Sequence, residues 1–288
     1  MRPSRSPRSS APTSPAASST GSSTGSTKSS ARRRDPLVRR PTIRYAILSD
    51  IHGNLEALTA VLGDAAAAGA DALLCLGDLV GYGADPVACV ERVGERAAAV
   101  VAGNHEYGAL GLMTLEWFNP AAKAAAIWTR DRLDEDHRRY LQSLPLKVAF
   151  EEATLVHASP RQPDEWDYLV TAEDGFEVFG EFETRLCFIG HSHRPDVWSL
   201  GSSGPEYAGY LTAPRAWVRL EDGRRYIINV GSVGQPRDRD PRAAYAIWDR
   251  DERTVSIRRV DYDHRRAAAK IIAVGLPRPL ADRLAHGV

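Results

Sequence analysis

The sequence contains few cysteines and no long apolar run. Three of its 288 residues are cysteine, and Cys75, Cys89 and Cys187 do not lie at metal-ligand spacing from one another, so no zinc-thiolate site is expected. Their odd number and apolar surroundings favour free thiols in a reducing compartment. The absence of a run of 18 apolar residues predicts no transmembrane helix. Arg32–Arg34 is not followed by the apolar segment of an export signal, so we expect a cytoplasmic protein.

Large apolar side chains are scarce in residues 1–40, which consist mostly of Ser, Arg, Pro, Thr, Ala and Gly. Such a segment buries too little surface to offset the entropy lost on ordering. We therefore predict a disordered basic tail, whose role the sequence leaves open. Residues 41–288 have the length and the apolar content of one globular domain.

The tail also separates the charges of the chain, whose net charge is zero. It carries nine of the 37 basic residues and one of the 37 acidic residues, which leaves the domain acidic. An acidic domain repels the phosphate backbone of a nucleic acid and attracts metal cations. We therefore expect no nucleic-acid or membrane partner. The oligomeric state is left open.

In the first half of the domain, apolar segments of strand length alternate with helical patterns. The predicted strands are residues 43–49, 72–76 and 97–101. Helices are predicted after Asn54, which suits an N-cap, and from Pro86, which suits a first helical turn. This alternation predicts a largely parallel sheet with helices on both faces. Ligands of such sheets bind just beyond the carboxyl ends of the strands.

The second half of the domain is rich in strands. Helical patterns cover residues 119–144 and 173–182, and residues 201–206 are expected to form a loose loop. The predicted strands are residues 146–150, 153–156, 186–189, 197–200, 207–211, 216–220, 226–230, 244–248 and 255–260. The first two would form a hairpin. A strand-rich half after an alternating half predicts two sheets packed face to face.

Polar clusters follow the predicted strands. They are Asp50-Ile51-His52, Gly77-Asp78, Gly103-Asn104-His105-Glu106, His157 and Gly190-His191-Ser192-His193, and they hold five of the eight histidines. Each cluster alone has an ordinary structural explanation, because Asp and Asn form caps and turns and a single His is usually hydrogen-bonded. Together they place seven nitrogen- or oxygen-bearing side chains at strand ends, which we expect at one edge of one sheet. We interpret this arrangement as a metal site.

The spacing within the clusters supports a metal site. In an extended segment, residues i and i+2 point the same way, so Asp50 and His52 can bind one ion together. His191 and His193 lie on a loop, from which they can turn towards neighbouring ions. Glycines before three of the polar side chains permit sharp turns. Mixed imidazole and oxygen ligands suit Mn, Fe, Zn or Co better than Mg or Ca.

The order Asp-x-His, Gly-Asp, Gly-Asn-His-Glu, a single His and Gly-His-Ser-His resembles the calcineurin-like metallophosphoesterase superfamily. The resemblance covers residues 43 to about 260 and includes every motif. Segments 50–54, 77–83 and 231–237 are similar to those of its small bacterial phosphodiesterase-type members. The resemblance implies an α/β fold, a four-layer α/β/β/α sandwich of two mixed β-sheets flanked by helices.

The resemblance also assigns the seven side chains to two divalent transition-metal ions, Mn in the first place, with Fe, Zn or Co as alternatives. The ligands of one ion would be Asp50, His52 and His193, and those of the other would be Asn104, His157 and His191. Asp78 would bridge the two ions. His105 would lie beside the leaving group without binding metal.

These roles imply a hydrolase that cleaves the phosphodiester or phosphomonoester bond of a small substrate. A hydroxide bridging the ions would attack phosphorus in line with the departing oxygen, and His105, as imidazolium, would stabilise or protonate that oxygen. Tyr82 either lines the pocket or packs on its loop. Arg237 either meets a phosphate or belongs to a solvated charged turn. Glu106 either orients a neighbour or begins a helix.

Two other functions stay open on this fold. A non-catalytic scaffold would have lost metal ligands, and none is absent here. A nuclease would need a basic groove beside the site, which the acidic domain argues against. The serine/threonine protein phosphatases carry Asp-Arg-Gly after the second motif and Arg before the third, where this chain has Val80–Gly83 and Ala102. These departures disfavour a phosphoprotein substrate.

Overall fold

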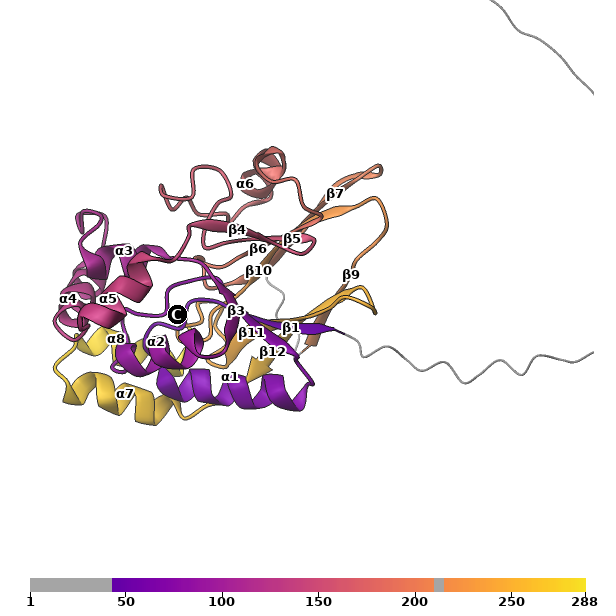
Figure 1. The fold of residues 1–288 in the computed structure, drawn as a ribbon. Coiled ribbons are helices and arrows are strands. Elements are labelled where there is room, and N and C mark those ends of the chain that lie inside the picture. Colours follow the sequence, from indigo (N-terminus) through magenta and orange to yellow (C-terminus); the bar gives the residue numbers. More distant parts are fainter. Residues whose placement is uncertain (1–42, 210–214) are drawn as a thin grey trace, which may run out of the picture. The chain divides into compact units, whose positions relative to one another are not determined.

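The computed structural model describes residues 43–209 and 215–288, so the predicted tail at residues 1–40 lies outside the described residues. The described part contains two six-stranded mixed sheets that pack face to face. Helices cover their outer faces (Figure 1). This arrangement confirms the four-layer α/β/β/α sandwich.

The first sheet has the strand order β3-β2-β1-β11-β12-β9. Its parallel strands are β1 (Arg44–Leu48), β2 (Ala72–Cys75) and β3 (Ala97–Val100). Its antiparallel strands are β11 (Ala243–Asp249), β12 (Thr254–Val260) and β9 (Arg215–Arg219). Because β1 lies inside the sheet, between β2 and β11, the residues that follow it emerge in the middle of the sheet's edge.

The second sheet has the strand order β4-β5-β6-β10-β7-β8. Its parallel strands are β5 (Ala153–Val156), β6 (Leu186–Ile189) and β10 (Arg225–Val230). Its antiparallel strands are β4 (Lys147–Phe150), β7 (Pro195–Gly201) and β8 (Gly204–Ala208). The predicted hairpin of β4 and β5 is confirmed.

The core consists of three stacked apolar layers. On β1, Ala46 and Leu48 face the helices, while Tyr45 and Ile47 face the second sheet, as the two-residue period of a strand requires. Because both faces of β1 are covered, its sequence is a continuous apolar run. Burying each large aliphatic side chain contributes roughly 1.5–3 kcal/mol.

Helices α1 (Leu55–Ala67) and α2 (Pro86–Gly94) cover the outer face of the first sheet, and α7 (His264–Ala273) lies beside α1 (Figure 1). The outer face of the second sheet is covered by α6 (Ala172–Glu177) and the 3-10 helix Phe179–Glu181. Each sheet therefore has helices on one face only, which corrects the expectation of helices on both faces. The other faces pack against each other.

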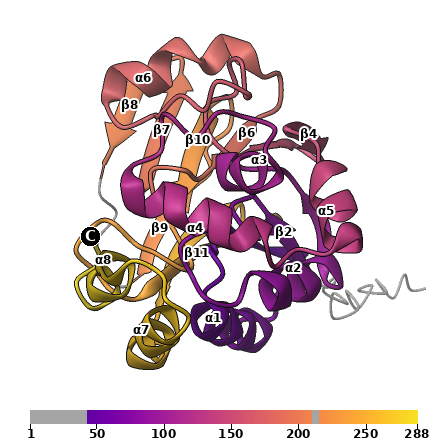
Figure 2. The same ribbon diagram turned by 90° about the vertical axis from the view of Figure 1, so that its left-hand side faces the viewer.

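A further group of helices lies beside the ends of the first sheet's parallel strands (Figures 1 and 2). It consists of α3 (Asn104–Leu110), α4 (Pro120–Arg130), α5 (Glu135–Gln142), α8 (Arg278–Asp282) and the 3-10 helix Arg283–Ala285. The C-terminal helices pack on α4 and on Tyr82 in one apolar cluster. The chain's last residues thus support the loop that follows β2.

The structure corrects three predicted segments. The helical region at residues 119–144 is two helices, because α4 ends before Asp131 and Asp134 caps α5. The helix predicted at residues 173–182 is the short α6 followed by the 3-10 turn. The expected loose loop at residues 201–206 is instead a tight turn, in which Gly201 pairs with Gly204 between β7 and β8.

The strand predicted at residues 207–211 is partly outside the described residues, and β8 ends at Ala208. The three cysteines are free and buried, as predicted, and burial raises the pKa of each thiol. Within residues 43–209 and 215–288, none of the helices combines the length and the apolar character needed to cross a bilayer.

Candidate metal centre

Asp50 and His52 lie in the turn that directly follows β1. Their φ angles are 53° and 50°, so both adopt the left-handed conformation that non-glycine residues rarely adopt. The extended geometry assumed from the sequence is therefore wrong, although the two side chains do converge. The turn is fixed to the loop after β2, because the Asp50 N–H donates to Gly77 O (3.1 Å) and the His52 N–H to Asp78 O (2.8 Å).

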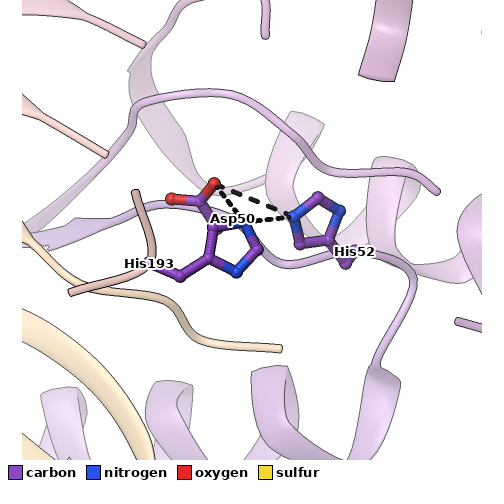
Figure 3. Close-up of side chains that lie close together, drawn as sticks. All are labelled: Asp50, His52 and His193. Atoms are coloured by element: carbon purple, nitrogen blue, oxygen red, sulfur yellow. Dashed lines mark hydrogen bonds and ion pairs between the residues drawn. The ribbon is translucent and has the colours of Figure 1, made fainter. Parts of the chain in front are cut away.

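Asp50, His52 and His193 form the first cluster, shown in Figure 3. The two Nε2 atoms are 3.1 Å apart, and Asp50 Oδ1 lies 3.2 Å from His193 Nε2 and 3.7 Å from His52 Nε2. Within the described part of the chain, this buried Oδ1 has no hydrogen-bond partner. The Nδ1 atoms face backbone carbonyls, Val80 O for His52 (3.1 Å) and Gln235 O for His193 (2.5 Å). Nδ1 therefore donates, and each Nε2 keeps a lone pair for a cation.

Asp78, His157 and His191 form the second cluster. His157 Nε2 lies 3.2 Å from His191 Nδ1 and 3.3 Å from Asp78 Oδ2. His157 Nδ1 faces Leu76 O at 2.8 Å, which again leaves Nε2 free for a cation. Asn104 begins α3, and its Oδ1 is buried without a hydrogen-bond partner among the described residues. An unpartnered buried oxygen is costly unless a cation or a donor completes it.

Asp78 of the second cluster also lies close to His52 of the first cluster through a single oxygen. Its Oδ2 lies 3.6 Å from His52 Nε2 and 3.3 Å from His157 Nε2, while Oδ1 accepts the His105 N–H at 2.9 Å. Burial raises the pKa of the Asp78 carboxyl, but His157, His105 and His52 outweigh this effect and hold the pKa below its ordinary value. Asp78 is thus an anion between two groups of nitrogen atoms.

The ionisation of the histidines fits a site that binds cations. Burial lowers the pKa of His191 to about 3 and holds the pKa of His193 well below its ordinary value, so both rings are neutral and offer lone pairs. Burial also lowers the pKa of His157, but Asp78 reverses the effect and raises it to about 9. Asp78 therefore favours a proton on His157, which a cation at Nε2 would displace. Metal binding releases such protons.

His105 lies close to His52 and Asp78, and the three side chains form a further group whose atoms are near enough to hold a metal ion. Its Nδ1 is buried and has no hydrogen-bond partner in the residues described. Burial lowers the pKa of His105 to about 3, so the ring is neutral near pH 7. Its centroid lies 4.4 Å from that of Tyr82 and 4.8 Å from that of His52.

A cavity of about 660 Å³ opens beside the two clusters. Tyr82 and Arg237 both line it, together with Asp78, His105 and further residues of α3 and the following segment. Arg237 Nη2 donates to Tyr82 Oη (3.3 Å) and to Gln235 Oε1 (3.0 Å). Arg237 therefore lies in the cavity wall and not in a solvated turn. Tyr82 lines the cavity and also packs on the C-terminal helices.

Residues 43–253 match the family model of the calcineurin-like phosphoesterase superfamily domain. The chain belongs to this superfamily. It is 40% identical over 248 residues to an uncharacterized protein of Methanocaldococcus jannaschii, with 84% of this chain and 97% of that protein covered.

Two solved structures are also similar to this phosphoesterase-family chain. A metallophosphoesterase from Sphaerobacter thermophilus has 40% identity and a TM-score of 0.74, with 86% of this chain and 100% of that chain covered. A hypothetical protein from Pyrococcus horikoshii OT3 has a TM-score of 0.68 at 19% identity, with 86% and 99% covered, and supports the fold alone. The family and the two clusters support a metal-dependent phosphoesterase that uses divalent ions.

In this phosphoesterase, Glu106 fixes the Asp78 loop, which answers the question that the sequence left open. Its Oε2 accepts the N–H groups of Asp78 (2.8 Å) and Gly103 (2.7 Å), and its Oε1 accepts those of Leu79 (2.7 Å) and Val80 (3.2 Å). Burial and the neighbouring Asp78 raise the pKa of Glu106 to about 7, against the effect of these donors. Glu106 also lies in the first turn of α3, so both sequence-based interpretations hold.

Asn229 on β10 holds the loop that carries His191 and His193, and the sequence analysis did not identify this role. Its Nδ2 donates to Gly190 O (2.6 Å) and Ser192 Oγ (3.0 Å), and its Oδ1 accepts the Gly231 N–H (3.0 Å). The side chain is completely buried. The sequence does contain a sign of this role, because Asn229 is an amide within an otherwise apolar strand. A buried polar side chain normally has hydrogen-bond partners, so its presence there indicates a contact with another segment.

The candidate ligands come from both sheets, which corrects the expectation of one edge of one sheet. Asp50, Asp78 and Asn104 follow β1, β2 and β3 of the first sheet, whereas the histidines of the second cluster follow β5 and β6 of the second sheet. The loops touch because Gly190 has no side chain, and a Cβ there would lie 1.9 Å from Ser49 Oγ. The His191 N–H also donates to Asp50 Oδ2 at 3.0 Å.

Proposed function

We propose that this protein is a dinuclear-metal phosphoesterase that hydrolyses the phosphodiester or phosphomonoester bond of a small substrate. The observation that carries the proposal is the position of Asp78 Oδ2, within 3.6 Å of His52 Nε2 and 3.3 Å of His157 Nε2. A carboxylate oxygen that lies between two sets of metal-binding nitrogen atoms can bridge a pair of cations, one bound by each set. A mononuclear site would not need the second set.

The donor atoms support the assignment of ligands made from the resemblance. One ion would be bound by Asp50, His52 and His193, and the other by Asn104, His157 and His191. Asp78 would bridge them. Imidazole nitrogen and carboxylate or amide oxygen suit Mn, Fe, Zn or Co, and Mn is the first ion to test. For His52, His157 and His193, the backbone carbonyls that accept from Nδ1 hold the rings in the orientation that binding requires.

When bound, two divalent ions supply positive charge to the phosphoryl oxygens and lower the pKa of a water between them. The protein's own residues position the ester. Arg237 lines the cavity, where its guanidinium charge would attract a phosphoryl oxygen. His105 lines the same cavity. It would donate a hydrogen bond or a proton to the departing oxygen, and general acid or base groups contribute about 10²–10⁴-fold.

The test combines metal content with turnover. The full chain is purified free of metal and titrated with Mn²⁺, and hydrolysis of bis(p-nitrophenyl) phosphate is followed by absorbance. We expect two ions per chain in the wild type. Asp78→Asn should bind at most one ion and lose more than about 100-fold in turnover, since even groups that only orient a ligand are worth 10–100-fold. Asp222→Asn, an exposed carboxylate that pairs with Arg253, is the matched control and should behave as wild type.

Two outcomes would contradict the proposal in different ways. A wild-type protein that turns over the ester with one ion per chain would refute the dinuclear assignment but leave the hydrolase. A protein that binds two ions and hydrolyses no phosphate ester would support the non-catalytic scaffold instead. Competition by single-stranded DNA would point to a nuclease, which the carboxylates Asp164 and Glu165 in the cavity wall disfavour.

A further inference from the structure

The cavity beside the metal centre is much larger than a phosphoryl group requires. Its volume of about 660 Å³ lies within the roughly 300–1,000 Å³ typical of pockets that enclose an organic ligand. Four of the proposed ligands line it, namely Asp78, Asn104, His191 and His193, and most of the other lining residues are not ligands. The remaining walls therefore carry information about the organic part of the ester.

Those walls are aromatic. One wall comes from α3 and the segment before α4, and it includes Tyr107, Trp117 and Phe118. The other comes from residues 164–168 and includes Trp166 and Tyr168. The Tyr107 and Trp166 rings meet edge to face with centroids 5.2 Å apart, so the two walls join into one surface.

The aromatic surface reaches the metal-binding side chains directly. The Tyr168 ring stacks on His191 at 4.0 Å between centroids, with an interplanar angle of 26°. The Phe118 ring lies 4.8 Å from the ring of His105, on the side where the departing oxygen would lie. At the mouth, Trp117 is 85% exposed and Leu112 is 48% exposed. A flat ligand on the ester would cover this apolar surface.

The charges of the wall select for a small substrate. Arg237 is the one Lys or Arg side chain that lines the cavity in the described residues, so the wall provides cationic charge for a single phosphate group. Asp164 and Glu165 lie in the wall next to Trp166. Ionised carboxylates accept hydrogen bonds, and they repel a second phosphate. They therefore suit N–H groups on the edge of a ring and disfavour polyphosphates and nucleic acids.

We infer that this aromatic cavity stacks a planar ring of the ester, and that the substrates are single-phosphate esters whose organic group carries a flat aromatic ring with N–H donors on its edge. The inference rests on the proposed function, because it names the substrate class of the same site. Stacking of a base on an aromatic side chain is tolerant of ring identity. The affinity of the cavity for the ester therefore depends on the presence of a flat ring more than on the substituents of that ring.

The experiment compares adenosine 5′-monophosphate with ribose 5-phosphate, which share the phosphate and the sugar and differ by the planar base. Binding to the Mn-loaded full chain is measured by calorimetry. We expect the ring-bearing ester to bind at least about tenfold more tightly. If phosphate is released during the titration, the ratio of kcat/KM values replaces the ratio of dissociation constants.

Variants of the cavity mouth test the origin of the preference. Trp117→Ala should bring the ratio of the two affinities towards one, and Trp117→Phe, which keeps a ring, should retain most of it. Trp217→Ala is the matched control, because Trp217 is 63% exposed on β9 and lines a different cavity. It should leave the ratio unchanged.

Equal affinity for the two esters in the wild type would overturn the inference. Tighter binding of phosphocholine than of adenosine 5′-monophosphate would also overturn it, since the rings would then form a cage for a quaternary ammonium group. Turnover of bis(p-nitrophenyl) phosphate is measured in parallel. Hydrolysis without a ring preference refutes the stacking site alone, and a ring preference without hydrolysis refutes the proposed function alone.

Discussion

The loop that carries His191 and His193 depends on one buried amide, and replacing it should weaken both the fold and the metal centre. In Asn229→Ala, the Gly231 N–H loses its acceptor, and Gly190 O and Ser192 Oγ each lose a donor. An orphaned buried N–H costs about 1–3 kcal/mol, and each of the other hydrogen bonds contributes about 1 kcal/mol. We expect a loss of about 3–5 kcal/mol in the free energy of unfolding.

The assay is urea unfolding of the metal-free protein, so that metal binding does not add to the stability. With an m-value of about 3 kcal/mol/M, the expected loss lowers the midpoint by about 1–1.7 M. The matched control is Asn119→Ala, which makes the same change at an exposed N-cap whose Oδ1 accepts the Ala122 N–H. Its expected cost is about 1 kcal/mol.

Metal affinity gives a second measure of the same change. If Asn229 orients His191 and His193 through their loop, Asn229→Ala should weaken Mn²⁺ binding by about 10–100-fold, whereas Asn119→Ala should not. The reasoning fails if Asn229→Ala unfolds at the same urea concentration as the control and binds Mn²⁺ within twofold of wild type. The histidine loop would then be held by other contacts.

Three further substitutions separate catalysis, geometry and stability. His105→Ala should keep two ions per chain and lower turnover of bis(p-nitrophenyl) phosphate by about 10²–10⁴-fold; loss of an ion would make His105 a ligand. Gly81→Ala should lower turnover at least about tenfold with metal retained, because φ is +87° and the new Cβ would lie 2.2 Å from the Nδ1 of that histidine. Gly180→Ala, where no described atom lies within 4 Å, is its control and should be neutral. Gly63→Ala in α1 also has open space and should raise the unfolding free energy by about 0.5–1 kcal/mol without changing metal affinity.

The sequence predicts the parts of the fold that local pattern determines. Strand β6 is found at the predicted residues, and the predicted helices after Asn54 and from Pro86 are present as α1 and α2. Apolar period, caps and prolines act over a few residues, so one sequence is sufficient to identify them. The break between α4 and α5 at Asp131–Asp134 was not predicted. An Asp inside a long helical pattern can cap a new helix or can lie on the exposed face of a continuous one, and the local pattern does not distinguish the two.

The sequence is less informative about how distant segments meet. The pairing of β1 with β11, which sets Ile47 opposite Ala246, joins segments about 200 residues apart, and no local pattern specifies it. The same is true of the two sheets that share the metal centre. Glu106 and Asn229 act through backbone groups of distant loops, and neither contact has a signature in residue spacing.

The backbone of the metal centre explains why the extended-strand argument was wrong and why the supporting hydrogen bonds are needed. Five proposed ligands have positive φ angles, namely Asp50, His52, Asp78, His191 and His193. For a residue other than glycine, such a conformation costs on the order of 1 kcal/mol or more and persists only when the surroundings determine it. Here the surroundings are the four donors gathered by Glu106 and the loop contacts of Asn229. These hydrogen bonds join protein groups only, so the fold itself contributes to holding the proposed ligands in these turns.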